Sequence, residues 1–268
     1  MIAPSGEGRM LLAIDVGNTN IVAGVFSRDA LVSHWRLETV RRRMPDEYAV
    51  LLDSLFRLAR LDSSRIAGAI ICSVVPSVQE TLCQTVRMYW GVDPLIVSLC
   101  LDLGIEVSYQ PREAVGADRI ANAVATIHRY GAPAIVIDFG TATTLDAIDR
   151  GGVYIGGAIA PGLKISEEAL YSHTARLPRV PLEPPGPAVG TSTATSLQSG
   201  ILYGYAGLVD GLVERFRREL GDDAHVIATG GLADAVVPHS STVQQTDLDL
   251  TLQGLYLLYM RNARTALD

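Results

Sequence analysis

The sequence predicts an α/β protein made of two halves that share one topology. Strand-like apolar runs alternate with amphipathic helical patterns along the chain. An Asp-x-Gly turn follows an apolar run twice, at Asp15 and at Asp138. With 268 residues, of which 48% are hydrophobic and 19% charged, the chain is also long enough for two domains with separate cores.

The first half begins with a strand, a tight turn and a second strand. Residues 11–15 are apolar and end in Asp-Val-Gly-Asn-Thr-Asn, residues 21–26 are apolar again, and Gly17 supplies the turn. A stripe of apolar residues at helical spacing predicts a helix over 46–61. The other elements predicted here are a strand over 66–75 that Pro76 ends, a helix over 77–90, a strand over 94–98 and a helix over 118–130.

The second half repeats this opening. The segment Val-Ile-Asp-Phe-Gly-Thr-Ala-Thr around Asp138 aligns with Ala-Ile-Asp-Val-Gly-Asn-Thr-Asn around Asp15. Two unrelated hairpins that both turn on Asp-x-Gly are the alternative, but the matching strand-like flanks favour a duplicated domain. We therefore expect a disordered extension over 1–10, a first domain over 11–130 and a second domain over 131–268.

The remaining elements of the second half follow from periodicity and proline content. Strands are predicted over 134–138, 144–149, 152–159 and 225–231, and helices over 195–220 and 252–266. The region from Ala160 onward is loop-rich, with a proline-rich wrapping loop between Leu177 and Gly190. The helix over 195–220 has an apolar side that indicates burial against another element or a second subunit, formed by Leu197, Ile201, Tyr205, Leu208, Leu212 and Phe216.

Composition argues against several classes of function. The net charge of −7 and the pI of 5.2 disfavour binding to nucleic acid or anionic membranes, and we interpret the run Arg41–Arg43 as a solvated loop. The three cysteines lack CxxC spacing and the five histidines lack HxxxH spacing, so neither a zinc site nor a disulfide framework is indicated. Without a signal peptide or a long apolar segment, the chain is expected to be cytoplasmic.

The two Asp-x-Gly turns are the best candidates for binding a nucleotide. In the first turn, Gly17 lets backbone N–H groups approach a phosphate, Asn18 and Thr19 donate hydrogen bonds, and Asp15 holds a metal ion or its water shell. One such turn is common in hairpins that bind nothing, but two turns that face each other across a cleft would clamp a triphosphate. A Walker loop and a GxGxxG signature are absent. The sequence Thr229-Gly230-Gly231 is a third glycine turn, which either accepts the adenosine or only joins a strand to a helix.

The segment Gly116-Ala117-Asp118-Arg119 has two interpretations. Asp118 stands where an ordinary helix N-cap would satisfy free backbone N–H groups. Alternatively, it accepts the proton of a substrate hydroxyl while Arg119 pairs with a substrate anion.

Six motifs in order resemble those of the type III pantothenate kinases, which belong to the superfamily of sugar kinases, actin and heat-shock ATPases. The resemblance spans nearly the whole chain. It implies two ribonuclease-H-like (actin-like ATPase) domains with a cleft between them, a homodimer, and ATP-dependent conversion of pantothenate to 4′-phosphopantothenate, the first step towards coenzyme A. The motifs are Asp15-Val-Gly-Asn-Thr-Asn, Ser73-Val-Val-Pro, Tyr109 with Gly116-Ala-Asp-Arg, Asp138-Phe-Gly-Thr-Ala-Thr, Gly156-Gly-Ala-Ile-Ala-Pro-Gly and Gln198-Ser-Gly.

The resemblance also implies a role for particular residues. Asp118 would be the catalytic proton acceptor. Asp138 would bind a monovalent cation, K⁺ or NH₄⁺, and Asp15 would bind Mg²⁺ directly or through water. ATP would contact Asp15, Val16, Gly17, Asn18, Thr19, Asn20, Ile21, Val22 and Thr141, and pantothenate would contact Tyr109, Gly116, Ala117, Asp118, Arg119 and Thr193.

One departure from the family pattern concerns the substrate loop. The family usually has Asn before the threonine that contacts pantothenate, whereas this chain has Ser192 before Thr193. The threonine is kept, so the departure puts the loop geometry and the substrate affinity in doubt rather than the reaction.

Two rival functions belong to other classes. Relatives described as accessory factors for gene expression suggest a regulator without catalysis, but intact Asp118, Arg119 and Asp138 argue against it. Another superfamily member, such as a sugar kinase or a polyphosphate hydrolase, is the second rival. Tyr109 and the Gly116–Arg119 segment favour pantothenate over these substrates.

Overall fold

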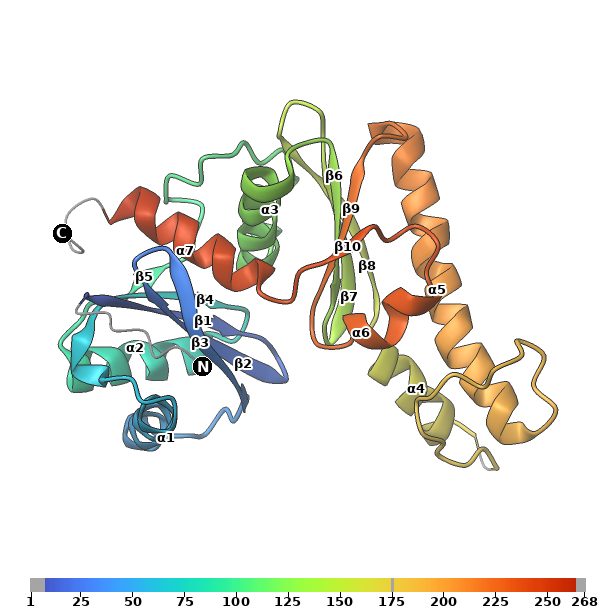
Figure 1. The fold of residues 1–268 in the computed structure, drawn as a ribbon, viewed down its shortest axis with the longest axis horizontal. Coiled ribbons are helices and arrows are strands. Elements are labelled where there is room, and N and C mark those ends of the chain that lie inside the picture. Colours follow the sequence, from blue (N-terminus) through green and yellow to red (C-terminus); the bar gives the residue numbers. More distant parts are fainter. Residues whose placement is uncertain (1–7, 175, 264–268) are drawn as a thin grey trace. The chain divides into compact units, whose positions relative to one another are not determined.

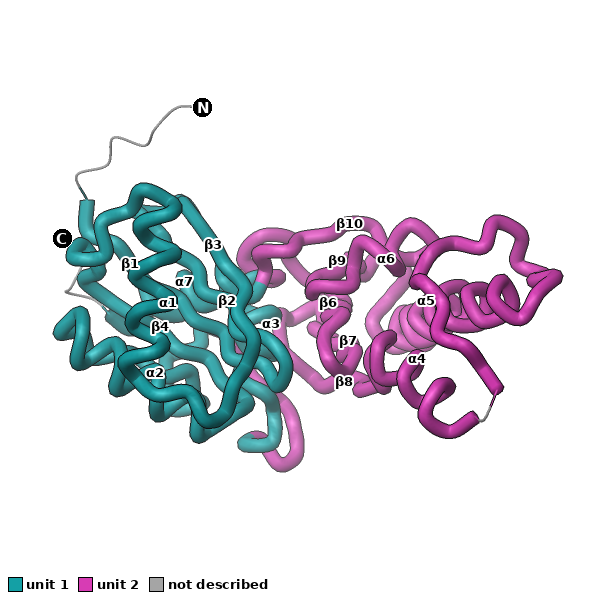
Figure 2. Tube along the Cα trace, turned by 90° about the horizontal axis from the view of Figure 1, so that it is seen from below, with its two compact units in different colours: residues 1–104, 113–125, 251–268 teal, residues 105–112, 126–250 magenta. Residues whose placement is uncertain are grey.

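The computed structural model describes residues 8–174 and 176–263, which form two compact units. The first unit comprises the described residues of 1–104, 113–125 and 251–268, and the second those of 105–112 and 126–250 (Figure 2). The units are interleaved in sequence, because the first unit includes nearly all of the last helix of the chain. The predicted domain limits of 11–130 and 131–268 stay a prediction.

The first unit is built on a five-stranded sheet with the strand order β3-β2-β1-β4-β5 (Figure 1). Strands β1 to β3 pair antiparallel, and β4 and β5 extend the sheet in parallel beside β1. The strands are β1 (Met10–Val16), β2 (Asn20–Ser27), β3 (Ala30–Glu38), β4 (Ile66–Ser73) and β5 (Leu95–Ile96).

Helices cover both faces of this sheet. On one face, α1 (Pro45–Leu58) and α2 (Pro76–Trp90) bury Tyr48, Phe56 and Leu82 against the alternate residues of β1 and β4. On the other face, α7 (Leu250–Asn262) approaches closely: a Cβ at Gly68 of β4 would lie 2.0 Å from the hydroxyl of Tyr259. The start of α3 (Ala117–Tyr130) packs against α7 in the same unit, where a Cβ at Gly254 would lie 1.9 Å from the carbonyl oxygen of Ala121.

The second unit has a five-stranded sheet with the order β10-β9-β6-β7-β8. Its core lies on the face covered by α5 (Thr193–Leu220), to which α4 (Leu163–Ser172) and α6 (Ala233–Val236) add further apolar side chains. Short 3₁₀ helices lie at Ser63–Arg65, Arg112–Ala114 and Val237–His239. The strands are β6 (Ala134–Phe139), β7 (Ala142–Ile148), β8 (Tyr154–Pro161), β9 (His225–Thr229) and β10 (Gln245–Thr246).

The strand orders confirm the predicted duplication. When β6 is matched to β1, β7 and β8 correspond to β2 and β3 on the antiparallel side of the sheet. On the parallel side, β9 and β10 correspond to β4 and β5. The turns differ in length, however. Asp15 pairs with Val22 across the first hairpin, whereas Asp138 pairs with Thr144 across the second, so the second turn is one residue shorter.

Several predicted elements need correction. Strand β3 and helix α4 were not predicted, and α4 lies in the region expected to be loop. Pro76 is the first residue of α2. On α5, Leu208 is 38% exposed and so does not belong to the buried side, which instead includes Leu202, Ala206, Val209 and Val213. The last helix ends at Asn262; residues 264–266 of the predicted helix, and residues 1–7 of the predicted extension, lie outside the described residues.

Candidate functional site

The turn that follows Asp15 is fixed by three hydrogen bonds. The N–H of Gly17 donates to the carbonyl oxygen of Asn20 at 2.9 Å. Thr39, after β3, donates its hydroxyl to the carbonyl oxygen of Gly17 at 2.8 Å and its N–H to that of Thr19 at 2.9 Å. Thr39 was not predicted as part of this site, and its contribution comes from strand β3, which the sequence analysis missed.

The predicted ATP loop divides into anchoring and exposed residues. Val16 and Ile21 are buried in the core of the first unit, so their side chains hold the hairpin in place. Between them, the side chains of Asn18, Thr19 and Asn20 are exposed. The turn therefore presents polar side chains and backbone on a rigid apolar base.

Cys72 brings two of the predicted carboxylates together. Its position on β4 is paired with Asp15 on β1, and its thiol is hydrogen-bonded to the Asp15 carboxylate. Burial raises the pKa of the Cys72 thiol well above its usual value, and the nearby carboxylates of Asp15 and Asp118 raise this pKa further. Asp15 thus contacts the buried thiol directly at the carboxyl end of β1, and Asp118 of the same unit is near enough to act on the thiol electrostatically.

Asp118 is held in the first turn of α3. Its Oδ1 accepts a hydrogen bond from the N–H of Arg119 at 2.9 Å. Because α3 begins at Ala117, Asp118 lies inside the helix and is not its N-cap residue, although it satisfies one free N–H as a cap would. A Cβ at Gly116 would lie 2.4 Å from Asp118 Oδ1, so glycine leaves the space that this carboxylate occupies.

The second turn places Asp138 against glycine backbone. Asp138 is the last residue but one of β6 and pairs with Thr229 on β9, as Asp15 pairs with Cys72. Gly230 follows with φ +92°, and a Cβ there would lie 2.4 Å from Asp138 Oδ1. Thr229-Gly230-Gly231 leads into α6, so it does join a strand to a helix, and its predicted contact with adenosine stays a prediction.

Gly162, the N-cap residue of α4 that follows β8, explains how the turn at Thr141 is packed. A Cβ at Gly162 would lie 2.1 Å from the carbonyl oxygen of Thr141 and 2.8 Å from that of Gly140. Glycine is therefore required where the start of α4 meets the turn. The Thr141 side chain is exposed.

The predicted pantothenate residues fall on both units. Gly116–Arg119 belongs to the first unit, and Arg119 is buried there, with 6% of its surface exposed. Tyr109 and Thr193 belong to the second unit. The ring of Tyr109 lies 6.3 Å from that of Tyr154, centroid to centroid.

Ser192 has a clear structural role. It is the N-cap of α5, where its hydroxyl oxygen accepts a hydrogen bond from the N–H of Thr195 at 3.2 Å. Serine and asparagine are about equally good N-caps, so this exchange keeps the helix start. Further along α5, Gln198 and Ser199 donate to the carbonyl oxygens of Pro181 and Ala188 and so hold the proline-rich loop.

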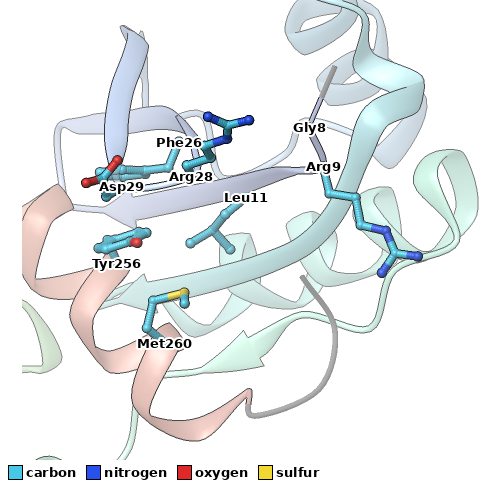
Figure 3. Close-up of a pocket in the computed structure, with 8 residues that line it drawn as sticks. All are labelled: Gly8, Arg9, Leu11, Phe26, Arg28, Asp29, Tyr256 and Met260. Atoms are coloured by element: carbon cyan, nitrogen blue, oxygen red, sulfur yellow. The ribbon is translucent and has the colours of Figure 1, made fainter. Parts of the chain in front are cut away.

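A pocket of about 380 Å³ lies away from these residues, at the amino end of β1 (Figure 3). Tyr256 and Met260 of α7 line it together with Leu11, Phe26 and the turn at Arg28 and Asp29. No predicted site residue lines this pocket. Within residues 8–174 and 176–263, no cluster of three or more His, Cys, Asp or Glu side chains suited to a metal ion is found, and no helix is long and apolar enough to cross a membrane.

Comparisons with known proteins agree with the motifs. The family profile described as type III pantothenate kinase matches residues 11–215. The type III pantothenate kinase of Geotalea uraniireducens is 47% identical over 256 residues, which cover 96% of this chain and 100% of that protein. The enzyme of the same name from Geobacter sulfurreducens is 48% identical over 253 residues, covering 94% and 99%.

Two solved structures show the fold. A conserved protein of the Baf family of transcriptional activators from Campylobacter jejuni matches with a TM-score of 0.59 at 20% identity, covering 94% of this chain and 99% of that one. Component A of (R)-2-hydroxyglutaryl-CoA dehydratase from Acidaminococcus fermentans matches with a TM-score of 0.55 at 14% identity, covering 96% and 99%. With the two matching sheets, this likeness confirms the predicted fold class, that of the actin-like ATPases.

Proposed function

Because the chain belongs to the type III pantothenate kinase family, it phosphorylates pantothenate with ATP, and we propose that Asp118 accepts the proton of the reacting hydroxyl. One observation carries this proposal. The Asp15 carboxylate is hydrogen-bonded to the buried thiol of Cys72, and the Asp118 carboxylate is near enough to raise the pKa of that thiol. The proposed proton acceptor is therefore in the neighbourhood of Asp15 and of the turn proposed to bind the phosphates, as transfer to an alcohol requires.

We propose that the turn over residues 15–22 binds the phosphates of ATP. Its backbone N–H groups and the exposed side chains of Asn18, Thr19 and Asn20 supply donors, while Val16 and Ile21 hold the hairpin. Thr141, on the second turn, contributes a further contact to ATP. The hydrogen bonds from Thr39 hold the first turn in one conformation, so the turn can bind an anion without rearranging its backbone.

Asp15 is the residue proposed to hold Mg²⁺. Its carboxylate offers the hard oxygen ligand that Mg²⁺ prefers, at a strand end beside the proposed phosphate turn. A single carboxylate with phosphate oxygens and waters is an ordinary ligand set for this ion, so the site does not need a cluster of three or more protein ligands. Bound there, the ion neutralises charge on the phosphate oxygens.

Asp138 is proposed to bind a monovalent cation, K⁺ or NH₄⁺. Its Oδ1 lies against Gly230, where the absence of a side chain lets the carboxylate approach the backbone closely. Carboxylate and carbonyl oxygens are suitable ligands for a hard cation of this kind. A positive ion beside this carboxylate offsets phosphate charge at a site with no Walker lysine.

For pantothenate we propose Tyr109, Gly116, Ala117, Arg119 and Thr193 as contacts beside Asp118. The guanidinium of Arg119 suits the carboxylate of pantothenate, because planar bidentate pairs are strong and directional. Gly116 keeps the Asp118 carboxylate in place by leaving it space.

We also propose that the enzyme is a cytoplasmic homodimer. On α5, Gly200, Gly204 and Gly207 share one helix face, and apart from the adjoining helix backbone no described atom lies within 4 Å of a Cβ built at any of them. This open face is the surface that a second copy would cover.

The test of the function is ADP release measured with and without pantothenate, in K⁺ and in Na⁺. We expect release that depends on pantothenate and is faster in K⁺. ADP release independent of pantothenate would indicate an idle ATPase, and no release would favour a regulator; either result would contradict the proposed function.

A further inference from the structure

One residue, Tyr154, fastens the segment that carries Tyr109. The N–H of Tyr154 donates to the carbonyl oxygen of Glu106 at 2.9 Å, and its own carbonyl oxygen accepts from the N–H of Ser108 at 2.8 Å. These two bonds form a parallel bridge between Val107 and the start of β8. The backbone leading into Tyr109 is therefore fixed by a single position on the sheet.

The aromatic rings continue this attachment. The rings of Tyr109 and Tyr154 are tilted by 56° with centroids 6.3 Å apart, a favourable aromatic arrangement. The Tyr109 ring also lies beside Gly156, whose φ of +136° suits glycine and where a Cβ would be 3.6 Å from Tyr109 Cδ2. Tyr109 thus rests on two neighbouring positions of β8.

Tyr154 is itself fixed by a buried carboxylate. Its hydroxyl donates to Asp146 Oδ1 at 2.8 Å, and neither side chain is exposed, with 0% for both residues. Thr144 directs its hydroxyl towards Asp146 Oδ2 at 3.5 Å. A buried carboxylate is tolerated only when its hydrogen bonds are made, so Asp146 restricts where the Tyr154 ring can lie.

We infer that Asp146 and Tyr154 are positioning residues that set the affinity for pantothenate by holding Tyr109. This inference rests on the proposed function of Tyr109 as a pantothenate contact. Neither residue needs to touch a ligand. Asp146 orients the Tyr154 ring, and Tyr154 fixes both the backbone and the ring of Tyr109.

The experiment compares Tyr154→Phe with Tyr130→Phe. The control removes a tyrosine hydroxyl that donates at 2.7 Å to another buried aspartate of the same unit, Asp247. For Tyr154→Phe we expect KM for pantothenate to rise roughly tenfold while KM for ATP stays within about twofold, because a small misplacement of a substrate contact weakens its binding. For Tyr130→Phe we expect both KM values to stay unchanged, whatever the loss of thermal stability.

A double-mutant cycle with Tyr109→Ala tests whether the effect passes through Tyr109. If it does, Tyr154→Phe changes the pantothenate Kd in the wild-type background and has no further effect in the Tyr109→Ala background. Equal effects in both backgrounds, or KM values for Tyr154→Phe that match those of Tyr130→Phe, would overturn the inference.

A further variant and two controls distinguish outcomes that would otherwise be ambiguous. Asp146→Asn keeps the size of the side chain and replaces one carboxylate oxygen, and we expect a smaller rise in KM for pantothenate in the same direction. If both site variants fail to fold while Tyr130→Phe folds, the pair serves stability alone and the inference is wrong. Wild-type protein that does not phosphorylate pantothenate would refute the proposed function instead, so the two failures are distinct.

Discussion

At the scale of single residues, Asp118 is the position where chemistry and folding can be separated. Its Oδ1 accepts the N–H of Arg119, and an asparagine oxygen can accept the same hydrogen bond. Asp118→Asn should therefore leave the melting temperature nearly unchanged. It removes the proposed proton acceptor, so we expect kcat to fall by about 10²- to 10⁴-fold, measured by ADP release with saturating pantothenate.

Asp62→Asn is the matched control for this change. Asp62 Oδ1 also accepts a backbone N–H at the start of a helical turn, from Ser64 at 3.0 Å, but on an exposed surface of the first unit. Its kcat should equal that of the wild type. Wild-type turnover in folded Asp118→Asn protein would remove Asp118 from the role of proton acceptor.

At the scale of elements, alanine substitutions at two glycines should separate the stability cost of backbone strain from that of a steric clash. One of the two glycines, Gly230, lies in the turn after β9. Gly230 has φ +92°, and a Cβ there would lie only 2.4 Å from Asp138 Oδ1, whereas Gly152 has φ +77° with no described atom within 4 Å of its Cβ position. Gly152→Ala should destabilise by about 1–2 kcal/mol, the cost of the left-handed conformation. Gly230→Ala should cost about 1–3 kcal/mol more, because a methyl group cannot be placed without displacing Asp138.

Chemical denaturation of both variants measures this difference in unfolding free energy. Because Asp138 is the proposed cation ligand, Gly230→Ala should also weaken the activation by K⁺, while Gly152→Ala should keep it. Equal stabilities for the two variants would mean that the turn can shift away from Asp138 without cost.

Elements with a strong apolar pattern were predicted from the sequence, and those without one were not. Strands β1, β4 and β6 are almost fully buried, and their predicted limits agree with the structure to within two residues. Strand β3 is an edge strand without a fully buried residue, and its apolar residues alternate only over its second half, where Trp35 and Leu37 pack on the core. Helix α4 has one buried residue, Leu163, and follows directly on Pro161-Gly162.

The supporting residues of the site were beyond sequence reasoning for a different reason. Asp15, Asp118 and Asp138 stand in recognisable motifs, whereas Thr39, Cys72 and Asp146 act through partners that only the folded chain brings near. Thr39 reaches Gly17 from 22 residues away, and Cys72 reaches Asp15 through a parallel strand pair. Periodicity and motif spacing report on local structure, so they contain no signal for such contacts.

At the scale of the whole molecule, duplication has given two turns with different surroundings. The residue paired with the aspartate is a buried cysteine in the first unit and a buried threonine, Thr229, in the second. The first turn is one residue longer and presents Asn18, Thr19 and Asn20, and the second places Asp138 against Gly230. The same backbone plan thus supports phosphate binding in one unit and cation binding in the other, as proposed.

The proposed homodimer makes a prediction about mass in solution. One chain has a mass of 28.7 kDa, so light scattering coupled to size-exclusion chromatography should give about twice that value. Gly204→Arg adds a long charged side chain where, apart from the adjoining helix backbone, no described atom of the same chain lies within 4 Å of the Cβ position, so the subunit should still fold. A second copy packed on this face would be displaced, because an unpaired charge buried in an interface is costly. We therefore expect Gly204→Arg to be monomeric with a near-native circular dichroism spectrum, and Glu219→Arg, exposed at the far end of α5, to stay dimeric. A dimer that survives Gly204→Arg would place the contact between subunits on a different surface.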